Sequence, residues 1–409
     1  MRQTGHADLP LHTGVVPKWL ADRMMQLGTL ITESLVINFG KKEFLRRLSD
    51  PLWFQSLGSV MGMDWHSSGI TTSVMRALQR GLNPRARELG IVVCGGRGKY
   101  SRKTPEELLF LADMAGLDGE GLVKSSKLCA KVDNNAVQDG FQLYLHNFVV
   151  TDEGDWSIVQ QGMNVDTKTA RRYHWCSLDL KSYVQEPHSG VVGENRGKIL
   201  NLIDSKADSA RKNILSLSVE KPELVLKEAS LINKTIVQKE NELDLWGAAE
   251  ERNLVMPAHH EVRKEDVNLK RLGAVLAVSN EANPQDFESL LLTPGLGPRT
   301  LQSLALVSEV IYGTPSRFND PARFSFAHGG KDGHPFPVPT KIYDETIRVL
   351  GDCIEQSRLG YDDKSKCLQR LYKTQLEIEE NCAPQADFEQ TILRERLNSK
   401  NWGGRVCGQ

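Results

Sequence analysis

The chain lacks the features that mark secreted, zinc-stapled or membrane proteins. It has seven cysteines in 409 residues, and no two of them form a Cys-x-x-Cys pair. An odd, dispersed set of this kind favours a reducing compartment over a disulfide framework or a structural zinc site. No apolar run reaches the ~18 residues of a membrane-spanning helix, and the first residues do not resemble a secretory signal. We therefore expect a cytoplasmic protein with no membrane segment.

A strong charge of either sign is also missing. The net charge is -1, with 40% hydrophobic and 25% charged residues, which is the composition of an ordinary globular protein. Any contact with nucleic acid must then come from local basic patches, and two are present, over 97–103 and 168–172.

Hydrophobic periodicity predicts an α+β protein that is mostly α-helical. Apolar residues at helical spacing predict a helix from Trp19 to Phe39, and two alternating segments around a polar turn predict a β-hairpin over 141–162. The basic stretch with Arg171 and Arg172 is expected on the helix that follows. We predict an α+β domain with a small sheet over 1–200, an all-α domain over 215–340 and a helical C-terminal segment over 341–409.

A stretch in the second half has the form of a turn between two helices. It runs Leu-Thr-Pro-Gly-Leu-Gly-Pro-Arg-Thr from Leu292, between an apolar helix that starts at Asn283 and a second helix that starts at Pro298. The two glycines leave backbone N–H groups uncovered near a helix N-terminus, where an anion such as phosphate is favoured. An ordinary turn between packed helices is the alternative interpretation.

This stretch, over 283–312, resembles a helix-hairpin-helix, a family of modules that bind the sugar-phosphate backbone of DNA. The resemblance implies DNA as partner, with backbone contacts and little base readout. The residues that would make these contacts are Gly295, Gly297, Arg299 and Thr300.

The continuation of the chain resembles helix-hairpin-helix DNA glycosylases. This resemblance implies a base-excision activity. Gly313, Pro315 and Asp320 match the glycine, proline and catalytic aspartate that follow the hairpin in that family. Asp320 would then stabilise an oxocarbenium-like sugar or activate water. Arg299 stands where members with lyase activity carry a lysine, so lyase chemistry through that position is excluded.

Polar side chains gather in apolar surroundings in the first half. Asp133 and Asp139 lie on a segment expected to be helical, and the following strand carries Gln160. Paired carboxylates hold Mg²⁺ or Mn²⁺, while lysine or histidine handles the proton of a phosphodiester cleavage. Asp133 and Asp139 are therefore candidate metal ligands. The candidate catalytic residues of this region are Lys131, Asp133, Asp139, Gln160 and His174. A hydrogen-bonded core network that fixes the helix against the hairpin is the alternative.

A basic, glycine-rich loop follows a short buried strand at 91–94. The loop, Gly95 to Ser101, does not match the Walker A pattern of ATP-binding sites, so contact with a nucleic-acid backbone is the better interpretation. The expected phosphate contacts of the first half are Arg97, Lys99, Arg102, Arg171 and Arg172.

Several stretches also resemble an uncharacterised family of archaeal and bacterial proteins that is classed as a domain of unknown function. The resemblance covers most of 1–340 and implies no particular reaction. The matching stretches are residues 5–12, 64–72, 94–105, 130–144, 159–175 and 186–189, the last reading Glu-Pro-His-Ser.

These observations predict a DNA-processing or DNA-repair protein. The first hypothesis is a metal-dependent nuclease that uses Asp133, Asp139, Lys131 and Gln160. The second is a helix-hairpin-helix glycosylase that uses Asp320. The third is a non-catalytic DNA-binding protein.

Overall fold

The computed structural model describes most of the chain up to residue 312 and short pieces beyond it. The described residues are 5–7, 16, 18–63, 69–164, 167–197, 199–230, 269–312, 319–322, 324–326, 338–339, 344, 347–348 and 404–405. Almost all of the expected C-terminal segment, and the Gly313 and Pro315 positions of the glycosylase resemblance, lie outside them.

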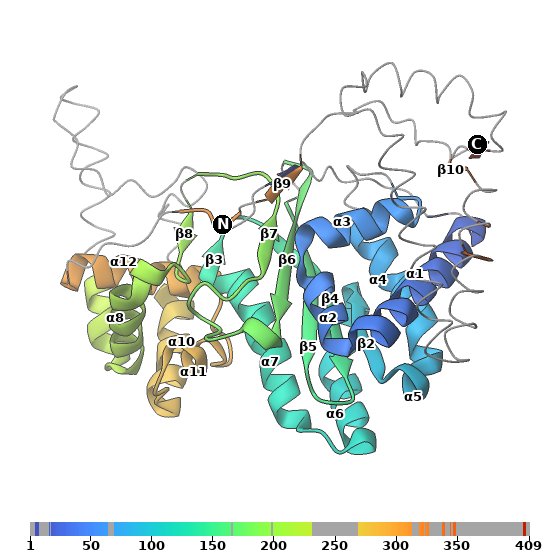
Figure 1. Ribbon diagram of the computed structural model, residues 1–409. Helices are drawn as coiled ribbons and strands as arrows, with labels where there is room; N and C mark the ends of the chain where they lie inside the picture. Colours follow the sequence, from blue (N-terminus) through green and yellow to red (C-terminus); the bar gives the residue numbers. More distant parts are fainter. Residues whose placement is uncertain are drawn as a thin grey trace, which may run out of the picture.

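The protein is a mixed α+β structure built on a seven-stranded sheet of order β1-β9-β7-β6-β5-β4-β2 (Figure 1). The strands from β2 to β7 in this order are antiparallel to their neighbours, and β9 and β1 join in parallel at the other edge. The strands are β2 (Ile91–Arg97), β4 (Gln142–Thr151), β5 (Trp156–Asn164), β6 (Thr169–Cys176), β7 (Gly190–Val192), β9 (Phe324–Phe326) and β1 (Gly5–Ala7).

The expected β-hairpin is present as β4 and β5. The polar turn between them is closed by a hydrogen bond from the backbone N of Thr151 to the backbone O of Asp155 at 2.9 Å. Gly154 has a φ of 85°, a conformation that glycine adopts without steric cost.

The helix expected around Arg171 and Arg172 is wrong, because these residues lie on β6 between β5 and β7. Alternation along the strand sends Arg171, Tyr173 and Trp175 to one face of the sheet and Arg172 and His174 to the other. Helices cover both faces, so the whole set is buried. The strand was not recognised in the sequence because buried strand positions are usually apolar, whereas several of these are basic.

One face of the sheet is covered by the N-terminal helices, drawn in blue in Figure 1. Their core includes Leu27, Phe44, Phe54 and Leu78, which join Val93 and Val159 of the sheet. Asp50 accepts hydrogen bonds from the backbone N of Leu52 and Trp53 and so caps the third helix. The helices are α1 (Lys18–Phe39), α2 (Lys41–Ser49), α3 (Pro51–Val60), α4 (Gly69–Leu82) and α5 (Ala86–Leu89).

The other face is covered by α6 (Thr104–Ala115) and α7 (Gly119–Lys131). Beside them pack α8 (Asp208–Val219), α10 (Leu269–Ala282), α11 (Phe287–Leu291) and α12 (Pro298–Tyr312) (Figure 1). Core side chains of α12 such as Leu301 and Leu304 belong to the same hydrophobic cluster as Phe148 and Trp175 of the sheet. The helices on both sides of the expected turn therefore share a core with the first half. The division into separate domains stays a prediction.

Among the helices of the described ranges, none combines the length and the apolar character needed to cross a membrane.

Candidate functional site

The site begins where α7 ends in one turn of π-helix, Val132–Ala136. Turns of this kind recur at functional sites, because the wider turn redirects side chains. The turn sends Asp133 toward the sheet, whereas Lys131 and Asn135 reach the opposite way, to the backbone O of Leu296 at 2.9 and 3.3 Å. Two of the predicted site residues thus have different surroundings although they are two positions apart.

Asp133 is fully buried and accepts three hydrogen bonds. Oδ2 accepts from Gln160 Nε2 at 2.6 Å and from Trp175 Nε1 at 3.0 Å, and Oδ1 accepts from His188 Nε2 at 2.5 Å. Burial raises the pKa of Asp133, and the three donors oppose that rise because they stabilise the ionised form. The arrangement is that of a carboxylate that orients a histidine.

Behind Gln160 the network continues into the core. The amide oxygen of Gln160 accepts from His146 Nδ1 at 2.7 Å, which leaves Nε2 of His146 to accept from Ser126 Oγ at 2.8 Å. Burial lowers the pKa of His146 to about 4. His146 is therefore neutral near pH 7 and holds the Gln160 amide in the orientation that donates to Asp133.

His188 lies in the wall of a cavity of about 450 Å³. The side chain is 5% exposed, and Nδ1 has no hydrogen-bond partner among the residues that the structure describes. Glu186, two residues earlier, has a φ of 46°, which is uncommon for a residue other than glycine. Its backbone N donates to Ile203 O at 2.8 Å, so this strained turn is anchored where the chain enters the site.

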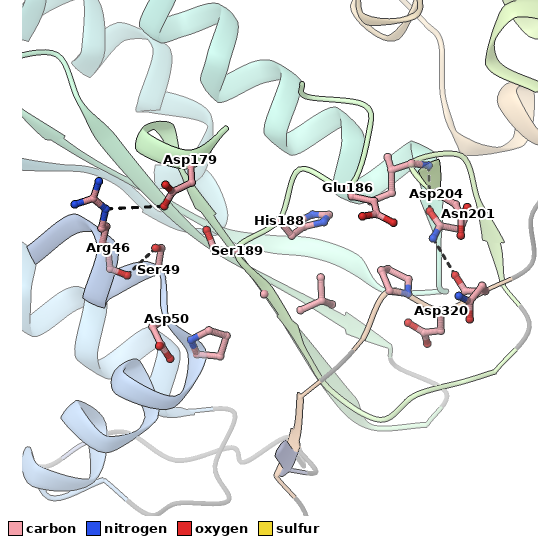
Figure 2. Close-up of a pocket in the computed structure, with 16 residues that line it drawn as sticks. Arg46, Ser49, Asp50, Asp179, Glu186, His188, Ser189, Asn201, Asp204 and Asp320 are labelled. Carbon is pink, nitrogen blue, oxygen red and sulfur yellow. Dashed lines mark hydrogen bonds and ion pairs between the residues drawn. The ribbon is translucent and has the colours of Figure 1, made fainter. Parts of the chain in front are cut away.

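Carboxylates are the commonest charged groups in the cavity wall, five of the sixteen lining residues. Figure 2 shows Arg46, Ser49 and Asp50 along one side, Glu186, Asn201, Asp204 and Asp320 along the other, and His188 and Ser189 between them. Arg46 is the one basic side chain among the lining residues, and it faces Asp179 at 4.0 Å. The cavity therefore favours neutral or positively charged groups over phosphate.

A second buried cluster supports one wall of the cavity. Arg171 donates to both oxygens of Asp320, at 2.9 and 2.7 Å, and to Asp139 Oδ2 at 3.0 Å. Tyr173 also donates to Asp139 Oδ2, at 2.6 Å. Burial raises the pKa of Asp139, and the positive charge of Arg171 opposes the rise. Asp320 also accepts from the backbone N of Arg196 and Ala322, so protein donors surround its carboxylate.

The structure thus separates the two aspartates that were expected to share a metal. Asp133 contacts His188, and Asp139 contacts Arg171 and Tyr173. Each oxygen of both carboxylates accepts from a protein donor, and both residues are fully buried. In the described part of the chain, no group of three or more His, Cys, Asp or Glu side chains is placed to hold a metal ion.

Arg172 and His174 lie on the far face of the sheet and are fully buried. Arg172 donates from Nε to His174 Nε2 at 2.8 Å and from Nη2 to Gln55 Oε1 at 3.0 Å. His174 Nδ1 donates to Leu48 O at 3.2 Å, and burial lowers the pKa of His174 well below its usual value. Burial also lowers the pKa of Arg172 to about 9. Neither side chain reaches the cavity or the surface.

Other predicted contacts do lie at the surface. Arg97, Lys99 and Arg102 are exposed at the end of β2. In the turn between α11 and α12, Gly295 and Arg299 are exposed, Gly297 is half-buried and Thr300 is buried. Gly295 has a φ of 82°, as a tight turn between helices requires.

Sequence reasoning did not select His188, Glu186, Asp204 or His146 as site residues. His188 and Glu186 stand in the Glu-Pro-His-Ser stretch at 186–189, and a histidine in a short polar loop before a strand is the signal that could have found them. His146 reaches Gln160 across the β4–β5 hairpin, and Asp204 reaches the cavity from the segment after Leu200–Asn201, a short strand that pairs with Val137–Gln138.

A family model described as "Protein of unknown function (DUF763)" matches residues 5–338. No curated protein and no solved structure matches the chain. The match spans the sheet, both helical layers and the cavity, so the resemblance to a family of unknown function is confirmed. The chain belongs to the family of proteins of unknown function DUF763.

Proposed function

We propose that the protein is a DNA-processing hydrolase that uses His188 for proton transfer and breaks an N-glycosidic bond. The observation that carries the proposal is the hydrogen bond from His188 to buried Asp133 in the wall of a carboxylate-lined cavity. A cavity of about 450 Å³ lies within the usual size range of small-molecule sites.

The pairing of His188 with Asp133 supports acid–base chemistry. A carboxylate that accepts from one ring nitrogen fixes the tautomer and orientation of a histidine, and it stabilises the imidazolium that forms when the other nitrogen takes a proton. Nε2 of His188 is the nitrogen bound to Asp133, so Nδ1 is the nitrogen available to a substrate or a water molecule. Trp175 packs its ring edge-on against His188 at 4.6 Å and further fixes the imidazole.

The negative charge of the cavity favours cleavage of a glycosidic bond over cleavage of a phosphodiester bond. Hydrolysis of an N-glycosidic bond passes through a sugar that carries positive charge, and carboxylates stabilise such a transition state. Phosphodiester cleavage builds up negative charge, which these carboxylates oppose in the absence of a cation. Glu186 and Asp204 are the lining residues that we assign to stabilising the sugar.

In the proposed reaction His188 Nδ1 takes a proton from water, and the water oxygen forms a bond to the anomeric carbon. The bond from that carbon to the base nitrogen breaks, and its electron pair leaves with the base. The imidazolium of His188 returns its proton to the departing base. The products are a free base and an abasic sugar, and no other reactant is required.

The proposal that the substrate is part of DNA rests on the turn between α11 and α12. The exposed Gly295 and Arg299, together with the N-terminus of α12, are the features expected of a helix-hairpin-helix. Lys131 and Asn135 hold the carbonyl of Leu296, and Gln138 Nε2 donates to Pro298 O at 2.7 Å. These contacts fix the turn relative to the π-helical segment 132–136, which carries Asp133, and this supports a shared role in binding one nucleic acid.

Asp320 also lines the cavity, as the glycosylase resemblance would require of its catalytic aspartate. Its carboxylate is already bound by Arg171 and by two backbone N–H groups, and the side chain is fully buried. We therefore assign Asp320 to shaping the cavity wall and His188 to the chemistry.

A metal-dependent nuclease is the second proposal, because Glu186 and Asp204 line the same cavity as His188. Both carboxylates would supply the oxygen ligands that Mg²⁺ or Mn²⁺ prefers. Direct ligation by Asp133 and Asp139, as expected from the sequence, would require both residues to give up their present donors.

Labelled oligonucleotides with normal, deaminated or oxidised bases test the proposal when they are incubated with the full chain in EDTA, Mg²⁺ or Mn²⁺. We expect alkali-labile abasic sites in EDTA, and a loss of at least about a hundredfold in rate for His188→Gln and Asp133→Asn. Asp113→Asn, at an exposed position on α6, is the matched control and should keep full activity.

Strand cleavage that requires a divalent cation and disappears in His188→Gln would show that the protein is a nuclease and not a glycosylase. Activity that survives both substitutions in folded protein would refute the assignment of this cavity. Thermal unfolding of each variant separates a loss of chemistry from a loss of structure.

A further inference from the structure

We propose that the loop after β2, defined as Arg97 at the strand end and the 3-10 turn over 98–103, is a binding surface for single-stranded DNA that extends the proposed active site. The loop carries Arg97, Lys99, Arg102 and Lys103, all exposed. None of these four cations has an ion pair within the described part of the chain. In a protein of net charge -1, four unpaired positive charges within seven residues mark a surface for a polyanion.

Aromatic rings are interleaved with the charges. Tyr100 is 49% exposed, and the Lys99 ammonium lies 5.5 Å from the centre of its ring. The Arg97 guanidinium lies 5.6 Å from the ring of Tyr144 on the neighbouring strand. An exposed ring beside cations offers a stacking face to an unpaired base and a charge to the adjoining phosphate. The bases of a duplex are stacked on one another, so the pattern favours a single strand.

The loop is held in one conformation by its own hydrogen bonds. Glu107 accepts from the backbone N of Gly95 at 2.7 Å, and Ser101 Oγ donates to Gly98 O at 2.6 Å. Thr104 Oγ1 donates to Ser101 O at 2.9 Å. A fixed loop loses little conformational entropy on binding, so its charges contribute fully to affinity.

The sheet places this loop at a defined distance from the cavity. Gly96 pairs with His146, His146 with Gln160, Gln160 with Tyr173, and Tyr173 with Val191, which lines the cavity. Four strand spacings of about 4.8 Å separate the two ends of this row by about 19 Å. At the ~3.4 Å per nucleotide of a stacked strand, a strand that reaches both places has about six nucleotides, and a more extended strand has fewer.

The inference rests on the proposed function only for the choice of DNA, and fluorescence anisotropy tests it without catalysis. The probe is a labelled single strand of mixed sequence well above six nucleotides, titrated with the full chain in EDTA at several salt concentrations. The test variant has Arg97, Lys99, Arg102 and Lys103 changed to Ala. The control variant has the exposed Lys124, Lys127, Lys221 and Lys227 changed to Ala, which alters the net charge equally.

The slope of the logarithm of the binding constant against the logarithm of the salt concentration should become shallower by about 3 in the test variant. Each phosphate contact with a single strand contributes ~0.7 to that slope, and four contacts are removed. Tyr100→Ser should weaken binding by about five- to a hundredfold. A mononucleotide should bind in the cavity of the wild type and of the test variant equally, because it is too short to reach the loop from there.

Equal salt slopes for the test and control variants would overturn the inference. So would tighter binding of a matched duplex, of RNA or of anionic lipid vesicles through the same residues. Loop-dependent binding without any hydrolysis would rule out the proposed function but would still support this binding surface.

Discussion

Arg171 donates two hydrogen bonds to Asp320, a residue that lies 149 positions further along the chain. The same guanidinium binds Asp139, so one buried positive charge joins two carboxylates from separate segments. Because Asp320 and its neighbours Asn319 and Pro321 line the cavity, this contact fixes one of its walls to the central sheet.

Arg171→Met is expected to reduce the free energy of unfolding by about 3–5 kcal/mol, since it leaves two buried carboxylates without their cation. Arg80→Met removes an exposed arginine that pairs with Asp22, and it should change stability by less than about 1 kcal/mol. Urea unfolding at pH 7 measures both. Similar losses for the two variants would show that the buried cluster contributes no more than a surface pair.

The buried His146 predicts loss of stability in acid. Its pKa is about 4 in the folded protein against 6.5 for the free side chain, so the unfolded chain takes up a proton first as the pH falls. The stability contributed by neutral His146 is complete above pH 6.5 and is lost as the pH falls to about 4, by about 3 kcal/mol.

The comparison with His146→Asn isolates this effect, because Asn can keep the hydrogen bond to Gln160 but does not titrate. Burial raises the pKa of Asp133 and Asp139, which acts in the opposite direction, but it does so in both proteins. The difference in unfolding free energy between them should therefore shrink by about 3 kcal/mol between pH 7 and pH 4. A constant difference would mean that His146 does not titrate as its burial implies.

Local patterns in the sequence predicted much of the scaffold. The β4–β5 hairpin and the helix start at Pro298 follow from alternation, turn residues and proline position, all of which are short-range signals. The strand β6 was missed because Arg171, Arg172 and His174 are buried polar residues, and only partners from distant parts of the chain make that burial possible.

The site was harder to predict than the scaffold for the same reason. Asp133 was selected, but the distance along the chain to His188 gave no sign that the two residues are hydrogen-bonded. The pairing depends on the order of strands in the sheet and on the π-helical turn at 132–136, and neither has a signature in a single sequence.

Lys131→Met is expected to loosen the turn between α11 and α12. The ammonium donates to Leu296 O, and Asn135 remains as a second donor to the same carbonyl, so the loss in stability should be about 1–2 kcal/mol. Amide hydrogen exchange over 293–300 should accelerate, whereas Lys127→Met, at an exposed position on α7, should leave it unchanged. Unaltered exchange in Lys131→Met would show that the turn does not depend on this contact.

Gly95 within β2 and Gly98 in the loop after it allow the cost of backbone strain to be distinguished from the cost of a steric clash. Both have positive φ, 87° at Gly95 and 60° at Gly98, so alanine at either position should cost about 1–2 kcal/mol. A Cβ at Gly95 would lie 2.2 Å from the carbonyl oxygen of His146, while a Cβ at Gly98 would meet nothing within 4 Å. Gly95→Ala should therefore be less stable than Gly98→Ala by a further ~1–3 kcal/mol in urea unfolding. Equal losses would mean that the loop shifts away from β4 without cost, and the rigidity on which the single-strand surface depends would be absent.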